Sequence, residues 1–279
     1  MEERRKLAKY VMDEGGLSER QACRTVNLHR CTYRYQAQKP DDHEIVQELR
    51  QLAESQPGWG CRKMTDYLRN QGHCWNHKRI RRVYRGLALN LHRKPKKRLA
   101  ARTALALGVP VQSDLTWSLD FMSDSLSNGR AIRTLNIIDD YNREALWIEV
   151  DTSLPAERVV RVLEHLLLWR ASPKQIRMDN GPELISQRLE NWAKEKQIEL
   201  IHIQPGKPAQ NAYIERFNRT FREDVLDAYL FNNLEEVRAI TERWLEDYNK
   251  LRPHEALQGL SPRQFALQNA SVSLLSTGI

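Results

Sequence analysis

The amino-acid sequence predicts an α/β fold preceded by all-helical segments, and three observations carry this prediction. In residues 4–91, apolar side chains recur at helical spacing, and turn residues separate the runs. From Asp114 the period changes, and three short runs of strand type follow one another. Beyond residue 155, helical and strand-like runs alternate, which is typical of α/β domains.

The composition limits the class of protein. Of 279 residues, 41% are hydrophobic and 29% are charged, so the chain can bury a normal core and is not a disordered chain. No apolar run approaches the roughly 20 residues that cross a bilayer, and the N-terminus lacks a secretory signal. We therefore expect neither a membrane protein nor an exported one. The four cysteines form no CxxC pair, which predicts reduced thiols in the cytoplasm.

Basic charge is concentrated in the first part of the chain. The formal net charge is +8, and residues 1–110 hold 24 Lys and Arg against 11 Asp and Glu. The remainder is mildly acidic, with 20 basic and 25 acidic residues. Such asymmetry is typical of a polyanion-binding module joined to a second domain. Nucleic acid is the leading partner, and charge alone leaves an acidic protein partner open.

Residues 1–38 are expected to form a segment like a helix-turn-helix. Ser18 and Gln21 fit a capping box at the start of a helix. A tight turn at 27–29 then leads into a basic helix at 30–36. A small helical hairpin with a solvated basic face is the alternative interpretation.

Residues 41–91 repeat this pattern at larger scale and predict a second helix-turn-helix domain that binds DNA. The expected helices cover residues 42–54, 62–70 and 76–89. One face of the third helix gathers basic side chains without an acid, namely Lys78, Arg79, Arg81, Arg82 and Arg85. Such a face can neutralise phosphates and release counterions, whereas the alternative is an ordinary solvated helix face. Residues 92–113 are expected to be a basic linker, because Pro95 disfavours helix there.

Residues 114–270 carry the elements of the α/β domain. The expected strands cover residues 115–122, 133–139, 144–150, 175–178 and 199–203. The expected helices cover residues 155–170, 185–197, 211–230 and 234–249, with a short one from 262. Three antiparallel strands, then helix, strand, helix, strand and helix, is the order of a ribonuclease H-like fold. We therefore predict a mixed sheet of three antiparallel and two parallel strands, flanked by helices.

Three carboxylates stand out within these elements. Asp120 lies inside the first strand among apolar residues, where an unpaired charge is costly. Asp179 ends the fourth strand, before an Asn-Gly turn, and Glu215 lies on the predicted helix 211–230. Carboxylates from two strands and one helix form a hard oxygen site suited to Mg²⁺ or Mn²⁺. Two such ions, about 3.5–4 Å apart, can activate the attacking oxygen and stabilise the leaving oxygen of a phosphodiester displacement.

The helix that carries Glu215 has a polar face. Asn211, Glu215, Asn218 and Arg222 follow at i, i+4, i+7 and i+11, so they share one side of the helix. That side presents amides, a metal ligand and a cation to one phosphate. Any one Asp or Asn is more often a turn or capping residue, so the prediction rests on the set together with the order of elements.

These residues resemble the catalytic core of insertion-sequence transposases of the IS-three family, relatives of retroviral integrases with a DDE (Asp-Asp-Glu) active site. The matching residues are Asp120, Asp179–Glu183, Gln204–Asn218, Arg222, Tyr248–Leu257, Ser261 and Pro262. The family's 35 residues between the second Asp and the Glu, and its basic residue seven after the Glu, are both present. Residues 41–91 resemble the helix-turn-helix segment that precedes this core.

The resemblance implies a metal-dependent DNA transposase. It would cleave a phosphodiester at the element's ends, and the freed 3′-hydroxyl would attack another strand. Asp120, Asp179 and Glu215 would bind the metal, Arg222 would contact DNA, Asn211 would support the site, and Lys207 would lie in a DNA-binding loop. The implied partners are the terminal inverted repeats, the target DNA, further copies of the chain and a protein from an upstream reading frame. The implied location is the bacterial nucleoid.

Two other functions stay open. A DNA-binding regulator with an inactive core would keep the basic helices and lose the chemistry. A ribonuclease H-type nuclease would need a carboxylate on the first helix of the core, where the chain offers Glu157 and Glu164.

Several further residues admit a structural interpretation. A zinc site made from Cys61, His73, Cys74 and His77 is disfavoured, because the helix pattern explains these residues. Asp139 and Asp140 are expected to serve a turn rather than to be a further ligand, and Glu183 to favour a helix start. His254 is expected to lie in a packed corner more than against DNA. Core packing is the expected role of the tryptophans at 117, 147, 169, 192 and 244.

Overall fold

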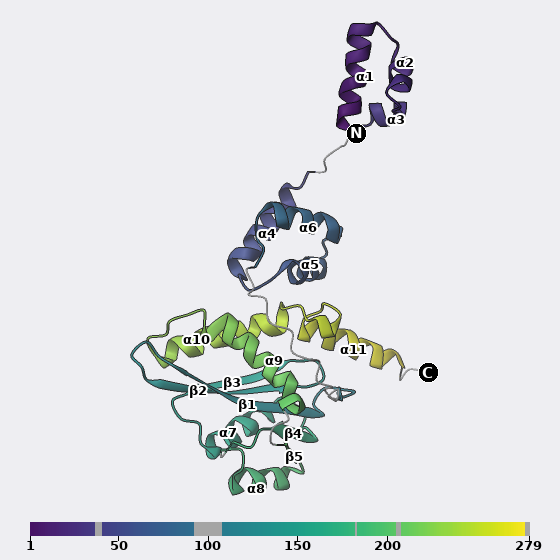
Figure 1. Ribbon diagram of the computed structural model, residues 1–279. Coiled ribbons are helices and arrows are strands. Elements are labelled where there is room, and N and C mark those ends of the chain that lie inside the picture. Colours follow the sequence, from purple (N-terminus) through teal and green to yellow (C-terminus); the bar gives the residue numbers. More distant parts are fainter. Residues whose placement is uncertain (37–40, 92–107, 182, 205–207, 277–279) are drawn as a thin grey trace. The chain divides into compact units, whose positions relative to one another are not determined.

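The computed structural model describes residues 1–36, 41–91, 108–181, 183–204 and 208–276 (Figure 1). The chain divides into two compact units, Met1–Glu44 and Ile45–Ile279. No helix within the described ranges is long and apolar enough to cross a membrane.

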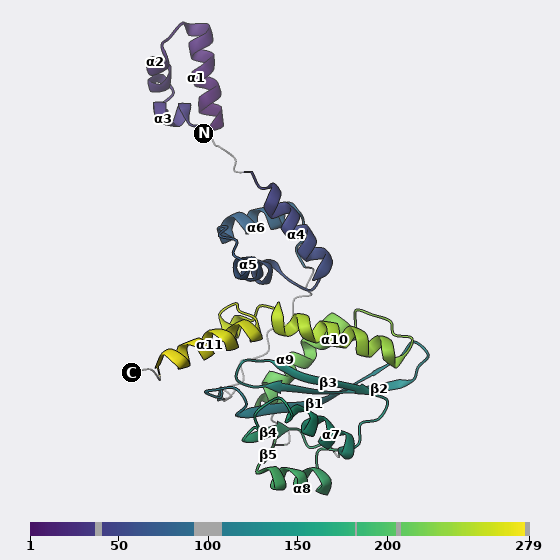
Figure 2. The ribbon, with the colours of Figure 1, turned by 180° about the vertical axis from the view of Figure 1, so that it is seen from behind.

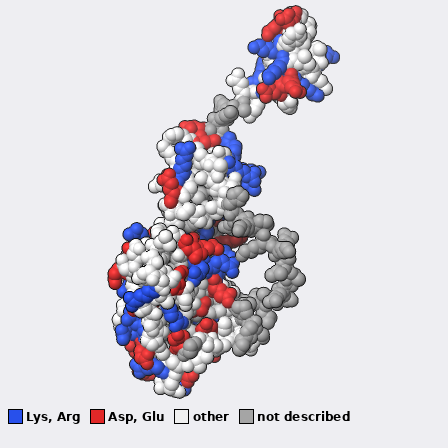
Figure 3. All heavy atoms as spheres, turned by 60° about the vertical axis from the view of Figure 1, so that its left-hand side comes forward, with Lys and Arg blue, Asp and Glu red and all other residues white. Residues whose placement is uncertain are grey.

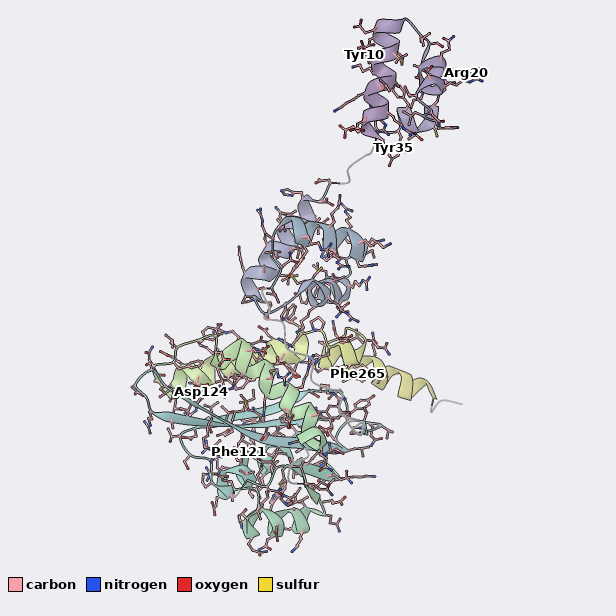
Figure 4. The ribbon with its side chains drawn as sticks, in the orientation of Figure 1. Tyr10, Arg20, Tyr35, Phe121, Asp124 and Phe265 are labelled. Carbon is pink, nitrogen blue, oxygen red and sulfur yellow. The ribbon has the colours of Figure 1, made fainter. Side chains whose placement is uncertain are left out.

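The first unit is built from three helices, α1 (Glu2–Gly15), α2 (Glu19–Thr25) and α3 (Arg30–Arg34). The expected capping box is confirmed, because the Ser18 side chain accepts from the Gln21 amide while the Gln21 side chain accepts from the Ser18 amide. The core of the unit is small, and its buried residues are Ala8, Ala22, Cys23 and Leu28. Figure 4 labels Tyr10, Arg20 and Tyr35 of this unit, and both tyrosines are exposed.

Helices α4 (His43–Ser55), α5 (Cys61–Asn70) and α6 (His77–Gly86) enclose an apolar cluster of their own. Trp59, in the turn between α4 and α5, is buried in this cluster together with Ile80, Val83 and Tyr84 of α6. The Asn76 side chain caps α6 by accepting from the Lys78 amide. Helix α6 ends three residues earlier than expected, and Ala88 beyond it has a left-handed φ of 55°.

A five-stranded mixed sheet follows, in the predicted arrangement (Figures 1 and 2). Its strands are β1 (Thr116–Ser125), β2 (Ala131–Asp139), β3 (Ala145–Asp151), β4 (Gln175–Met178) and β5 (Glu199–His202). The order across the sheet is β3-β2-β1-β4-β5. The first three strands pair antiparallel. β4 pairs parallel with β1, and β5 pairs parallel with β4. The predicted ribonuclease H-like order of elements is therefore confirmed.

Helices cover both faces of the sheet. On one face, α7 (Ala156–Leu166) and α8 (Gln187–Lys196) pack over an apolar cluster that contains Trp117 and Leu119 of β1. On the other face, α9 (Ala212–Phe221) and α10 (Leu234–Lys250) pack over a second cluster that contains Met122 of β1. Because side chains alternate along a strand, Asp120 lies on the α9 face.

Two of the predicted core helices differ in extent. The helix expected over 211–230 ends at Phe221, and a π-helical turn, Arg222–Leu226, follows it. This wider turn keeps Val225 in the same apolar cluster as Phe221 while the chain leaves the sheet. The helix expected to be short from 262 is α11 (Pro262–Ser276), of 15 residues.

The first helix of the core and one tryptophan also depart from expectation. Helix α7 ends at Leu166 instead of Arg170, because Arg170 turns back to the sheet and forms ion pairs with Asp114, Asp139 and Glu144. Trp169 follows the helix and is 53% exposed, so its predicted place in the core is wrong.

Candidate active site

The sheet brings Asp120 and Asp179 to neighbouring strands. Parallel pairing sets Thr116 of β1 opposite Gln175 of β4 and Ser118 opposite Arg177. Continued by two residues, the same register sets Asp120 opposite Asp179, which directly follows β4. Glu215 lies in the first turn of α9, the helix that packs against β1, and its side chain is exposed.

Asp120 lies in an acidic and half-buried environment. The pKa of Asp120 is raised to about 6, mainly by burial and in addition by the negative charges of Asp179 and Glu215. Hydrogen bonds from the Phe121 amide and the Asn218 side chain act in the opposite direction and do not offset the rise. Among the described residues, no three His, Cys, Asp or Glu side chains are gathered closely enough to hold a metal ion. The trio is thus electrostatically coupled, but it does not form a closed cage.

Two asparagines orient the Asp120 carboxylate. Asn218 of α9 donates from Nδ2 to Asp120 Oδ2 at 2.7 Å. Asn136 of β2 is fully buried and donates from Nδ2 to Asn218 Oδ1, also at 2.7 Å. In the β1–β2 ladder, Asn136 is the residue directly opposite Asp120. The chain of amides therefore fixes the rotamer of Asn218 and, through it, the direction in which Asp120 points.

Three residues of the predicted polar side of the helix contact β1. Asn211 donates to the Leu119 carbonyl at 3.4 Å, Asn218 reaches Asp120, and Arg222 forms an ion pair with Asp124 at 3.1 Å. Figure 4 shows Asp124 on the α9 side of the sheet and Phe121 on the other. Arg222, expected to contact DNA, is therefore engaged by a carboxylate of its own chain in this structure.

The loop after Asp179 is held by contacts that the sequence did not indicate. The Gly181 amide donates to Asp179 Oδ1 at 3.0 Å. Glu183 forms an ion pair with Arg133 of β2, which lowers the pKa of Glu183, and this guanidinium lies over the Phe121 ring. Glu183 was expected to favour a helix start, but α8 begins only after Ser186 caps it. Its contribution is to tie the Asp179 loop to β2.

The two acids at the end of β2 have internal partners. Asp139 is buried and accepts from the Asp114 and Tyr141 amides, with Arg170 at 3.5 Å. Asp140 is buried as well, and it accepts from the Ser118 hydroxyl and the Arg177 guanidinium. Burial raises the pKa of both carboxyls. Their predicted place in turn structure, instead of a ligand set, agrees with these contacts.

The remaining predicted positions fall into four groups. On α6, Lys78, Arg81, Arg82 and Arg85 are exposed and Arg79 is half-buried, and Figure 3 shows basic side chains on the surface of the helical segments. Lys207 lies outside the described residues. Glu157 and Glu164 are exposed on α7, on the face of the sheet opposite to α9. All four cysteines are free thiols.

Comparison with protein families gives matches over most of the chain. Residues 110–208 and 196–262 each match a model described as integrase core domain. Residues 40–98 match a model described as HTH-like domain, that is, helix-turn-helix-like.

Similar full-length proteins are encoded by bacterial insertion elements. The chain is 39% identical over 266 residues to the insertion element IS407 31.7 kDa protein of Burkholderia multivorans, covering 94% of this chain and 95% of that one. It is 36% identical over 265 residues to the IS476 39.2 kDa protein of Xanthomonas euvesicatoria, covering 94% and 76%. It is 26% identical over 243 residues to the transposase InsD of the IS2 elements of Escherichia coli, covering 82% and 80%.

Among solved structures, a simian T-cell lymphotropic virus intasome matches with a TM-score of 0.49 at 16% identity, covering 77% of this chain and 73% of that one. The HTLV-2 integrase catalytic core in complex with magnesium matches with a TM-score of 0.45 at 17% identity, covering 56% and 98%.

Proposed function

The chain belongs to the integrase-core proteins of bacterial insertion elements, in the IS-three family, and from this premise we propose that it is the element's DNA transposase. Its reaction is phosphodiester cleavage at the ends of the element, followed by attack of the freed 3′-hydroxyl on another DNA strand. The observation that supports this proposal is geometric: the β1–β4 register sets Asp120 opposite Asp179, and Glu215 lies in the first turn of α9, which packs against β1.

The donor chemistry of this site fits a divalent cation. Three carboxylates are hard oxygen ligands of the kind that Mg²⁺ and Mn²⁺ prefer. Asp120 is half-buried and has two acidic neighbours, and a bound cation would offset the burial and the repulsion that raise its pKa. When bound, two such ions would supply charge stabilisation for the attacking and leaving oxygens. Asp120, Asp179 and Glu215 would hold them.

The protein groups around the carboxylates position them. Asn218 and Asn136 orient Asp120, and Asn211 anchors the start of α9 to the Leu119 carbonyl. Arg222, once released from Asp124, would meet a phosphate beside the site. The basic face of α6 and Lys207 would hold DNA through phosphate contacts, which position a duplex without reading its sequence.

The organisation follows the same division of labour. We assign residues 1–38 and 41–91 to DNA binding, 92–113 to a linker and 114–270 to catalysis. Pairing two ends of an element requires more than one copy of the chain, and an upstream-frame protein of the element is a further partner. The place of action is the bacterial nucleoid.

A cleavage and strand-transfer assay tests this function. The full chain is mixed with labelled duplexes that carry the element's terminal inverted repeats, with MgCl₂, with MnCl₂ or with EDTA. We expect 3′-end cleavage and joined products only with metal, and none from Asp120→Asn, Asp179→Asn or Glu215→Gln. Metal-independent binding without any product would instead support the regulator. Cleavage of an RNA–DNA hybrid, but not of an element end, would support a ribonuclease H-type nuclease.

A further inference from the structure

A cavity of about 890 Å³ lies beside α9, and most of the charged residues in its lining are basic. All its lining residues belong to the compact unit Ile45–Ile279. Helices α5 and α6 contribute Arg62, Lys63, Arg81 and Arg85 to one wall. The core contributes Arg143, Arg216 and Arg252 to the other wall. Asp66 and Glu255 are the acids of the lining, and none of the three catalytic carboxylates lines the cavity.

The ion pairs of the described residues neutralise only part of this positive charge. Arg252 is buried and forms an ion pair with Asp224. Arg62 pairs with Glu255 at 2.8 Å, but both side chains are more than 70% exposed, so this pair holds little charge in place. Over the part of the chain that the structure describes, Arg81, Arg85, Arg143 and Arg216 form no ion pair. Positive charge therefore remains on both walls.

Arg143 has an unmet hydrogen-bonding group inside this structure. Its guanidinium lies over the Tyr213 ring, 3.4 Å from the centroid, and its Nη1 is buried without a hydrogen-bond partner. A buried donor without a partner costs about 1–3 kcal/mol. The backbone of Arg143 also has a left-handed φ of 60°, an uncommon conformation for a residue with a side chain. A small movement of the Arg143 side chain would let this donor reach an acceptor in the cavity and relieve that cost.

His254 lines the same cavity, and the positive charges around it act on its pKa. The pKa of His254 is lowered to about 3, mainly by burial and in addition by the positive charges of Arg252, Lys63, Arg216 and Arg143. The cavity thus disfavours a further positive charge and favours a negative one.

We propose that this cavity binds the sugar–phosphate backbone of DNA at a second site, separate from the catalytic carboxylates. The inference rests on the proposed function, and it names where the duplex is held while its end reacts. Arginine forks suit phosphate oxygens, and the two opposed walls suit consecutive phosphates better than a single ion. Glu215 and Arg216 are adjacent on α9, so a strand held by Arg216 lies beside the helix that supplies the catalytic Glu.

Duplex binding measured as a function of salt tests the proposal. Fluorescence anisotropy with a labelled 40-base-pair duplex, from 50 to 300 mM KCl without divalent metal, gives the affinity and its salt slope. The full chain is compared with Arg143→Gln/Arg216→Gln and with the charge-keeping variant Arg143→Lys/Arg216→Lys. A matched control, Arg161→Gln/Lys194→Gln, removes two exposed charges from α7 and α8, outside the cavity lining. Thermal unfolding of each variant reports its folding.

We expect the glutamine pair to weaken binding by about tenfold per lost phosphate contact near 0.1 M salt, and to reduce the salt slope by about 2. The lysine pair and the control should keep the slope of the unchanged chain. Equal slopes for the glutamine pair and its control, with both proteins folded, would overturn the proposal. So would binding of free inorganic phosphate with no effect of these variants on duplex affinity. If the chain cleaves no element end but its duplex affinity still depends on Arg143 and Arg216, the proposed transposase function is refuted and the proposed DNA-binding cavity is retained.

Discussion

The two sides of α9 differ in the charge that the protein leaves uncompensated. Toward β1, Asp120 has the carboxylates of Asp179 and Glu215 as charged neighbours, and amides are its hydrogen-bond donors. Toward the cavity, Arg143 and Arg216 form no ion pair with any carboxylate of the described residues. Elsewhere in the same domain, buried acids such as Asp139 and Asp140 are matched by Arg170 and Arg177. At these two structural positions, each buried acid has an arginine partner. The unpaired sets lie where we propose that a cation binds on one side and an anion on the other.

The largest effect is expected on the acidic side. Asp120→Asn removes the charge but keeps the shape of the side chain, so we expect cleavage to fall at least about a thousandfold, near 4 kcal/mol of transition-state stabilisation. The thermal midpoint should stay the same or rise, because the repulsion between carboxylates is relieved. The measurement is cleavage rate and thermal unfolding on the same preparation. A clear loss of stability would mean that Asp120 is a structural residue.

The next effect concerns the amide chain behind Asp120. Asn136→Ala leaves Asn218 free to rotate, and removal of such a supporting partner typically costs about 10–100-fold in activity or metal affinity. The Mg²⁺ concentration for half-maximal cleavage should rise with it. Thr134→Val is the matched control, because the Thr134 hydroxyl lies on the same strand, is buried and has no hydrogen-bond partner. If both variants lose the same activity, Asn136 acts only through packing.

A smaller effect is expected when an acid is added to the basic side. Ala256 is exposed and lines the cavity, so Ala256→Glu should neutralise part of its potential and lower the salt slope of DNA binding by roughly one unit. Ala171→Glu, at an exposed position outside the lining, adds the same charge as a control. The contrast between the two sides of α9 would fail if both variants weakened binding equally.

The smallest effect is a pH dependence of stability. The folded pKa of His254, about 3, lies below its value of 6.5 in an unfolded chain, so the unfolded state binds more protons between these values. Stability from this group is therefore full above pH 6.5 and is lost as the pH falls, by up to about 1.4 kcal/mol per pH unit. His254→Phe should reduce the change in the urea midpoint of unfolding between pH 7 and pH 4.5. His43→Gln, which removes an exposed histidine, should not.

Local sequence patterns predicted the helices and strands, and they predicted the residues on the acidic side of α9. Strand periodicity and turn residues placed Asp120 and Asp179, and helical spacing put Asn211, Asn218 and Arg222 on a common side that does follow β1. The trio's role as metal ligands stays a prediction.

What the sequence did not reveal depends on contacts between distant segments. Asn136 bonds Asn218 across 82 positions, and Arg133 pairs with Glu183 across 50. Local periodicity carries no information about such pairs. A polar residue among apolar neighbours in β2 was the one signal that pointed to Asn136. The early end of α9 follows from tertiary packing of Val225, which overrides helix propensity.

The position of β1 in the middle of the sheet has a mechanical consequence. β2 pairs with this strand through Asp120 and β4 pairs with it up to Ser118, so the sheet holds the main chain that carries Asp120. Asp179 and Glu215 stand just past the end of a four-residue strand and in the opening turn of a helix. Any adjustment that brings the three onto shared ions therefore falls to those two, while Asp120 serves as the fixed reference point. We expect insertions or deletions in the turns of the domain to leave the position of Asp120 unchanged.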